Sequence, residues 1–111
     1  MASKIRGVGL CNCFLELADV VDKSLSVNRD SQRGMWPEAE KRFDELRKTV
    51  SELERCLSDV EGFPVSLEIE EHLEELKAAI GARDKLAVTD QVSNVLFRLI
   101  LRACNPRPRA T

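Results

Sequence analysis

The stretch WPEAEKRFDELRKTVSELERCLSDVEG, residues 36–62, carries the clearest secondary-structure signal in the chain. Its apolar residues recur at alternating intervals of four and three, which is the spacing of one face of an α-helix. Pro37 suits the first turn of a helix, and Gly62 suits a left-handed residue at its end. We therefore predict one long amphipathic helix. Its expected buried face consists of Ala39, Phe43, Leu46, Val50, Leu53, Leu57 and Val60.

Two further helices are expected on the C-terminal side of this stretch. The first follows Ser66, a good N-cap residue, and ends at Gly81 in a left-handed conformation. The second is capped by Asp84 and extends to about Cys104, because Pro106 cannot continue it. The expected buried faces are Ile69, Leu73, Leu76 and Ile80 in the first helix, and Val88, Val92, Val95, Leu96, Leu99, Ile100 and Ala103 in the second.

A fourth amphipathic helix is expected near the N-terminus, from about residue 8 to about residue 26. The polar segment VNRDSQRG, residues 27–34, is rich in turn-forming residues and is predicted to be a loop. The polar side of this helix is expected to carry Asn12, Glu16, Asp19 and Lys23. Its buried side is expected to carry Leu10, Phe14, Leu17, Ala18, Val21 and Leu25.

These four segments predict an all-α fold, a four-helix up-down bundle in a single domain with short second and third connections. The chain has 111 residues, 43% of them hydrophobic and only 5% aromatic, which suits one helical core better than a β-sandwich. Residues 1–104 are assigned to the helical bundle domain. Residues 105–111 are assigned to a flexible basic tail.

Charge and hydropathy narrow the classes of partner. With a net charge of −2, the chain lacks the excess of positive charge that binding to nucleic acid or to an anionic membrane surface usually requires. No apolar run is long enough to span a bilayer, and Asn12, Glu16 and Asp19 interrupt the apolar N-terminal stretch, so we expect no signal peptide. We therefore expect a cytoplasmic protein with reduced cysteines.

The pair Cys11 and Cys13 raises the question of a metal site. On an intact helix these two side chains point about 200° apart, so they cannot share one ion. The chain contains no C-x-x-C or C-x-x-H pair, which zinc sites commonly use. We therefore expect no metal and no cofactor, and we interpret these cysteines as small apolar residues.

His72 is the only histidine, so no nucleophile–base–acid set can be assembled, and we expect no catalytic residues and no enzyme activity. A histidine on a helical bundle is also found in phosphotransfer domains. However, Glu75 and Leu76 stand where those domains carry lysine and glycine, and the neighbouring acids would repel a phosphoryl group. A signalling bundle that uses His72 as phosphoacceptor or pH-sensitive group is therefore the alternative function.

The last helix carries a second apolar stripe in addition to its expected core face. This stripe consists of Phe97, Leu101 and Cys104, with Arg98 and Arg102 at its rim. Two explanations stay open: either neighbouring segments of the same chain cover the stripe, or it forms an interface. The second explanation gives the leading hypothesis, a non-enzymatic interaction module that forms a homodimer or binds an amphipathic helix of another protein.

The segment ARDKLAVTDQVSNVL, residues 82–96, resembles an uncharacterised family of small bacterial all-helical domains. Asp84 and Asp90 match two aspartates of that family at the start of its last helix. Lys85 and the Ser93–Asn94 pair depart from it, because the family has aromatic and acidic residues there. The resemblance implies a helical bundle and no particular activity.

Overall fold

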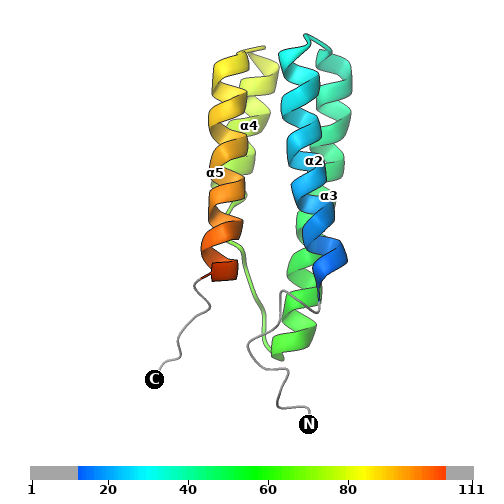
Figure 1. Ribbon diagram of the computed structural model, residues 1–111, viewed down its shortest axis with the longest axis vertical. Coiled ribbons are helices and arrows are strands. Elements are labelled where there is room, and N and C mark those ends of the chain that lie inside the picture. Colours follow the sequence, from blue (N-terminus) through cyan, green and yellow to red (C-terminus); the bar gives the residue numbers. More distant parts are fainter. Residues whose placement is uncertain (1–12, 105–111) are drawn as a thin grey trace.

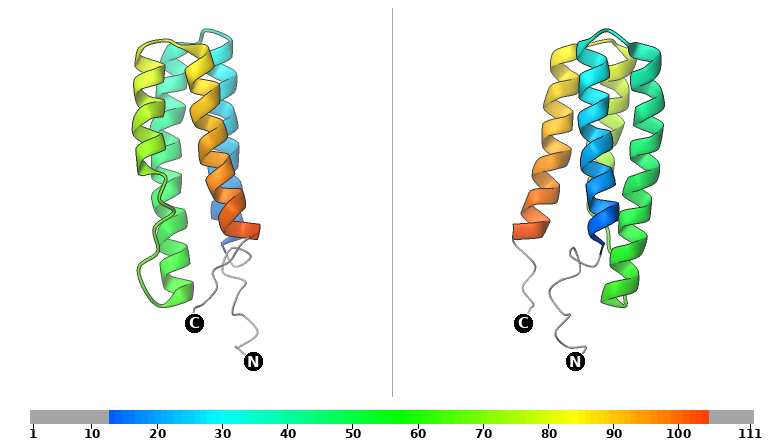
Figure 2. Two further views of the ribbon diagram at one scale, coloured as in Figure 1. Left: turned by 90° about the vertical axis from the view of Figure 1, so that its left-hand side faces the viewer. Right: turned by 45° about the vertical axis from the view of Figure 1, so that its right-hand side comes forward.

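The computed structural model describes the backbone of residues 13–104 and the side chains of residues 13–102. Within this range the protein has four helices and no strand: α2 (Phe14–Gln32), α3 (Trp36–Glu61), α4 (Glu70–Gly81) and α5 (Lys85–Cys104). Successive helices run antiparallel, α2 lies beside α3 and α5, and α4 lies beside α5 and α3 (Figures 1 and 2). The predicted all-α four-helix bundle is confirmed. No helix within the described range combines the length and the apolar character that crossing a bilayer requires.

Helix α3 agrees with the prediction from its spacing. Every residue of its expected face is buried except Val60, which is 38% exposed in the last turn. Gly62 has φ +86°, and its N–H donates to the carbonyl of Ser58 at 2.8 Å. This left-handed residue ends the helix as expected. The expected face of α4, Ile69, Leu73, Leu76 and Ile80, is also buried.

The connection between α3 and α4, residues 62–69, runs back along the last turns of α3 (Figure 2). The N–H of Leu67 donates to Glu54 Oε2 and the N–H of Val65 donates to Ser58 Oγ, both at 2.8 Å. Leu67 is only 2% exposed. Burial of this extended segment delays the start of α4 to Glu70, so the prediction that Ser66 caps the helix is wrong.

The connection between α4 and α5 differs from expectation at one residue. The left-handed conformation belongs to Arg83, with φ +55°, and not to Gly81, which lies in α4. The predicted cap of α5 is confirmed, because Asp84 Oδ1 accepts a hydrogen bond from the N–H of Ala87 at 3.1 Å.

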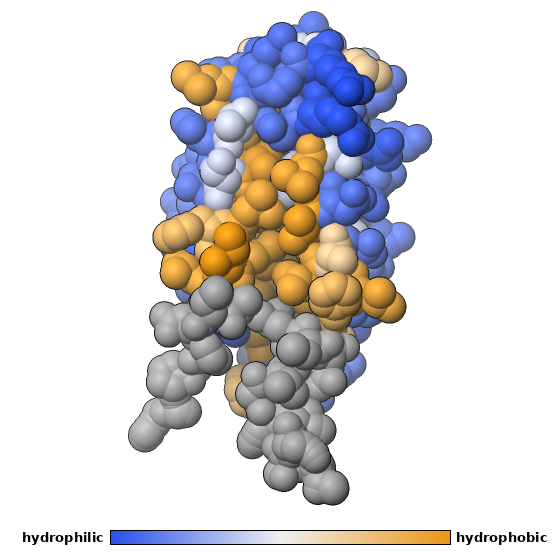
Figure 3. Space-filling view, in the orientation of Figure 1, coloured by the Kyte–Doolittle hydropathy of each residue, from blue (hydrophilic) through white to orange (hydrophobic). Residues whose placement is uncertain are grey.

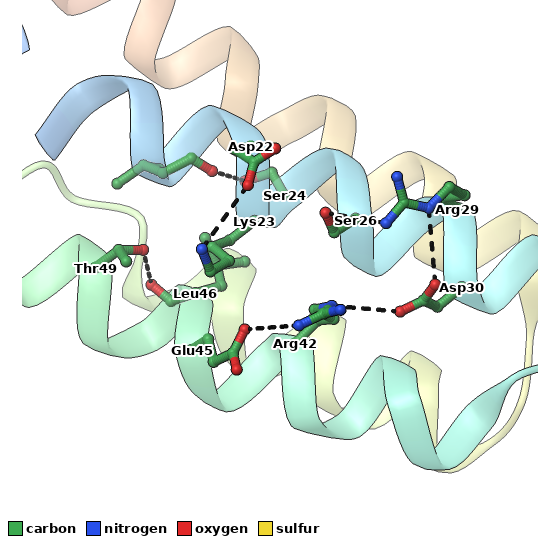
Figure 4. Close-up of polar contacts among 11 residues, drawn as sticks. Asp22, Lys23, Ser24, Ser26, Arg29, Asp30, Arg42, Glu45, Leu46 and Thr49 are labelled. Atoms are coloured by element: carbon green, nitrogen blue, oxygen red, sulfur yellow. Dashed lines mark hydrogen bonds and ion pairs between the residues drawn. The ribbon is translucent and has the colours of Figure 1, made fainter. Parts of the chain in front are cut away.

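Helix α2 continues through most of the segment that was predicted to be a loop. Val27, Asp30 and Ser31 are buried, and only Arg33–Met35 connect α2 to α3. Figure 4 shows the Asp30 carboxylate between two guanidinium groups, 3.8 Å from Arg29 Nε and 3.7 Å from Arg42 Nε. Asp30 is therefore buried beside Arg42 of α3, although its Oδ2 has no hydrogen-bond partner among the described residues. Tertiary packing overrides the local turn preference of this segment.

A disulfide joins the start of α2 to α3. Cys13 and Cys56 are 43 positions apart in the sequence, and their Cα atoms lie 6.0 Å apart. The structure therefore corrects the expectation that these two cysteines are reduced thiols. Cys13 belongs to the buried side of α2, and Cys56 flanks the buried face of α3, so helix packing brings their side chains together. Cys11 and Cys104 lie outside the residues whose side chains are described, as does the tail predicted for residues 105–111.

Arg47 links α3 to α4 through two carboxylates. Its guanidinium nitrogens lie 3.1 Å from Glu70 Oε2 and 2.7 Å from Glu74 Oε2. The hydrogen bond from Arg47 lowers the pKa of the exposed Glu74 carboxyl below its usual value, and the hydrogen bond from Glu74 raises the pKa of Arg47. These contacts hold the first turn of α4 against the middle of α3.

Loss of the Cys13–Cys56 disulfide should destabilise the bundle. A disulfide that closes a long loop restricts the unfolded chain and stabilises a small domain by about 2–4 kcal/mol. We expect a loss of this size for Cys56→Ser in urea denaturation, and no comparable loss for Cys104→Ser, which leaves the pair intact. An unfolding midpoint that is unchanged by reduction would show that the bond contributes nothing to stability.

The Arg47–Glu74 pair should add a small pH-dependent component to stability. Because the pKa of Glu74 is lower in the folded protein, the contribution is complete above its unfolded pKa and disappears as the pH falls through its folded pKa. The difference in thermal midpoint between wild type and Glu74→Gln should therefore shrink from about pH 6 to about pH 3. Glu75→Gln is the control, and a difference that stays constant with pH would contradict the assignment.

Candidate interaction face on α2 and α5

The stripe predicted on the last helix lies on the outer side of α5. Phe97 is 58% exposed and Leu101 is 41% exposed. At about 100° per residue, both lie nearly opposite the buried face formed by Val88, Val92, Val95 and Leu99. Cys104 was predicted in the same stripe, but its side chain lies outside the described range.

One prediction about the surroundings of this stripe needs correction. Ile100 was expected in the core but is 56% exposed, because its position on the helix lies toward α2 rather than toward the centre of the bundle. Arg98 and Arg102 lie on the side of α5 that faces α4, and Arg102 Nη1 donates to the carbonyl of Ser66 at 3.3 Å. The two arginines therefore border the stripe along one edge only.

Helix α2 is rotated relative to the prediction. Phe14 and Leu25 were expected in the core but are 62% and 52% exposed, and Ala18 is also exposed. Leu17 and Val21 are half-buried at the edge of the core. The side that packs inward is formed by Cys13, Val20, Ser24, Val27 and Ser31.

Small and polar side chains explain this rotation. Together with the half-buried Leu17, the inward residues of α2 recur at alternating intervals of four and three residues. Two of them are serines, which a hydropathy pattern assigns to the surface. In the structure Ser24 Oγ donates to the carbonyl of Val20 at 2.8 Å, so its hydroxyl is satisfied within the helix. Serines at these positions allow α2 and α3 to approach closely.

Hydrogen bonds fix the register between α2 and α5. Gln32 Nε2 donates to the carbonyl of Lys85 at 3.0 Å and to Thr89 Oγ1 at 3.1 Å, and Thr89 Oγ1 donates to Asn28 Oδ1 at 2.8 Å. Asn28 of α2 is paired with Thr89 of α5, and the two helices are antiparallel. A residue that precedes Asn28 therefore lies level with the residue that follows Thr89 by the same number of positions, so Val21 lies level with Leu96.

The exposed apolar side chains of the two helices, together with the half-buried Val21 and Leu96 between them, thus form one surface, which we call the α2–α5 face. Figure 3 shows apolar surface over the parts of α2 and α5 nearer the chain ends, and polar surface over the opposite end of the bundle. Leu15, 75% exposed, continues the face around the outer side of α2. The face consists of Phe14, Ala18, Val21 and Leu25 of α2 and Leu96, Phe97, Ile100 and Leu101 of α5.

His72 lies away from this face, between α4 and α5. It is half-buried, and its Nδ1 is 3.3 Å from Gln91 Oε1, which also accepts a hydrogen bond from Asn94 Nδ2 at 3.2 Å. The His72 ring therefore contacts the neutral amide of Gln91 on α5. The alternative role of His72 in signalling stays a prediction.

Comparisons with family models, with curated proteins and with solved structures give no match to this chain. The resemblance of residues 82–96 to small bacterial helical domains therefore stays a prediction. The function has to be argued from the geometry of the chain itself.

The rotation of α2 predicts that truncation of Leu25 has little effect on stability, and the buried Leu53 of α3 provides the comparison. Leu53 is fully buried, so Leu53→Ala should destabilise the protein by about 2–5 kcal/mol. Leu25→Ala should change the free energy of unfolding by no more than about 0.5 kcal/mol, because its side chain is already half in water. Urea denaturation at low protein concentration measures the free energy of unfolding of both variants. A loss of several kcal/mol for Leu25→Ala would show that Leu25 is a core residue and would contradict the rotation of α2.

Proposed function

We propose that the protein is a non-enzymatic interaction module that associates with a second copy of itself through the α2–α5 face. The observation that carries the proposal is the gathering of exposed apolar side chains on adjacent parts of two helices. Keeping apolar surface in water is unfavourable by about 25 cal/mol per Å². Monomeric proteins rarely expose contiguous apolar patches larger than a few hundred Å², and larger patches mark interaction sites.

The width of the face favours a second copy over a single partner helix. Leu15 on α2 and Phe97 and Leu101 on α5 point outward, away from the line where the two helices meet. A single amphipathic helix packed along that line would leave these outer side chains in water. A second copy presents an equally wide two-helix surface, and a two-fold axis would pair each patch with its equivalent.

A cytoplasmic location is part of the proposal and has a consequence for the disulfide. In that compartment thiols are kept reduced, and disulfides there are usually transient or redox-sensing. The proposed association depends on α2 and α5 and needs no particular state of Cys13 and Cys56. The His72 alternative lacks comparable support, because His72 is half-buried and its Nδ1 is within hydrogen-bonding distance of Gln91.

Leu101→Asp tests the proposal, with Leu86→Asp as the matched control. Leu86 is also an exposed leucine of α5, 74% in water, but it lies beyond the face near the turn from α4. A charge buried within the interface should weaken dimerisation by about 30-fold or more, corresponding to about 2 kcal/mol. Sedimentation equilibrium measures the dissociation constant, and circular dichroism should report unchanged helix content for both variants.

Two results would overturn this proposal. If Leu101→Asp unfolds while Leu86→Asp does not, Leu101 belongs to the core and the α5 half of the face fails. A wild-type chain that stays monomeric at all accessible concentrations would exclude self-association. Phe14→Asp provides a second variant on α2, and it should weaken the dimer to a similar extent if both helices take part.

A further inference from the structure

Cys13, Glu16 and Cys56 form a cluster beside the start of α2. The two sulfur atoms and a carboxylate oxygen of Glu16 all lie within 4.8 Å of one another. Cys13 is fully buried, whereas Glu16 and Cys56 are half-buried and closer to solvent. Glu16 takes part in none of the ion pairs found among the described residues. Its carboxylate is therefore available beside the sulfur pair.

In the oxidised protein the two sulfurs are bonded to each other and offer no thiolate. Thiol–disulfide exchange with a small thiol reductant changes this: two reductant thiols become one disulfide, and Cys13 and Cys56 each gain a proton. Reduction then leaves two thiols and one carboxylate at the same place. These are ligand types that zinc accepts, and three protein ligands with one open position are a common zinc arrangement.

The backbone around the cluster should keep the three ligands together after reduction. The carbonyl of Cys13 accepts a hydrogen bond from the N–H of Leu17 at 2.9 Å, so Cys13 is anchored to the first turn of α2. On α3, Cys56 lies between Leu53 and Leu57 in the sequence, and both of these leucines are core residues. The separation of 6.0 Å between the cysteine Cα atoms is set by the packing of α2 on α3.

We propose that the reduced protein binds one thiophilic divalent cation, such as Zn²⁺, through Cys13 Sγ, Cys56 Sγ and the Glu16 carboxylate. Binding replaces two thiol protons by one metal ion, so two protons are released to solvent for each ion bound. The same two sulfurs form either the disulfide or the metal site, and never both. Exchange with a small disulfide oxidant forms the Cys13–Cys56 bond, converts the oxidant to two thiols and therefore releases the metal. The metal ligands are not residues of the proposed dimer face.

The experiment uses the full chain with Cys11→Ser and Cys104→Ser, so that Cys13 and Cys56 are the only cysteines. The protein is reduced with a thiol reductant, desalted without air and titrated with Co²⁺, whose thiolate charge-transfer band reports sulfur ligation. Competition with a chromogenic chelator gives the Zn²⁺ affinity. We expect one ion per reduced chain and none per oxidised chain.

Three further variants in this background separate the ligands. Cys13→Ser and Cys56→Ser should abolish the charge-transfer band or reduce it to that of one weakly bound thiolate. Since loss of an outer-shell partner lowers metal affinity by about 10- to 100-fold, loss of the ligand in Glu16→Gln should weaken Zn²⁺ binding at least tenfold. Asp19→Asn is the matched control, because Asp19 is an exposed carboxylate one turn further along α2 and should not affect binding.

Each of several results would refute the site. Reduced protein that binds no Zn²⁺ at micromolar concentration, or oxidised protein that binds it equally, overturns the proposal. Cys56→Ser with wild-type affinity would place the metal elsewhere. Glu16→Gln is a conservative change at a half-buried position, and unchanged affinity in this variant would remove Glu16 from the ligand set.

Discussion

Helix α2 packs on α3 through a narrow seam of small side chains, and this seam sets the rotation of α2 about its own axis. The disulfide from Cys13 to Cys56 closes one end of the seam. The ion pair between Asp30 and Arg42, with nitrogen and oxygen 3.7 Å apart, closes the other end. Between them, Ser24 is buried without a bulky side chain to separate the two helices. The packing of these small side chains on α3 sets the rotation, and the contacts at the two ends of the seam add to it.

Both candidate sites follow from that rotation. With Cys13 directed inward, Phe14 and Leu25 must lie about 100° or more away from the seam, on the side of α5. They meet the outward residues of α5 and produce a wide apolar surface. On the other flank, the same rotation brings Glu16 toward α3 and places its carboxylate beside the sulfur pair. One packing arrangement thus explains an apolar face on one flank of α2 and a polar cluster on the other.

The parts of the fold that were predictable from sequence are those whose buried residues are large and apolar. The face of α3 and the stripe of α4 are continuous in leucine, isoleucine, valine and phenylalanine, so their spacing identifies the buried side. The sequence also separated Phe97 and Leu101 from the core face of α5 formed by Val88, Val92, Val95 and Leu99, but it left open whether other segments cover them.

Helix α2 was not predictable in this way. Its inward side includes serines and an aspartate, which hydropathy assigns to the surface. Only the packing of α2 on the rest of the bundle shows that they are buried. Hydropathy therefore assigned Phe14 and Leu25 to the core and left the α2 half of the face unrecognised. The Cys13–Cys56 pairing was not predictable from the sequence either, because contact between positions 43 residues apart depends on how the helices pack.

The most direct test of the interaction face is hydroxyl-radical footprinting of the wild-type chain over a range of protein concentrations. This measurement reads the solvent exposure of individual phenylalanine and leucine side chains. Phe97 and Phe63 are almost equally exposed in the single chain, 58% and 59%, but only Phe97 belongs to the face. We expect labelling of Phe97 and Phe14 to fall as the concentration rises, while labelling of Phe63 stays constant. Parallel labelling of Phe97 and Phe63 at every concentration would contradict the proposed function.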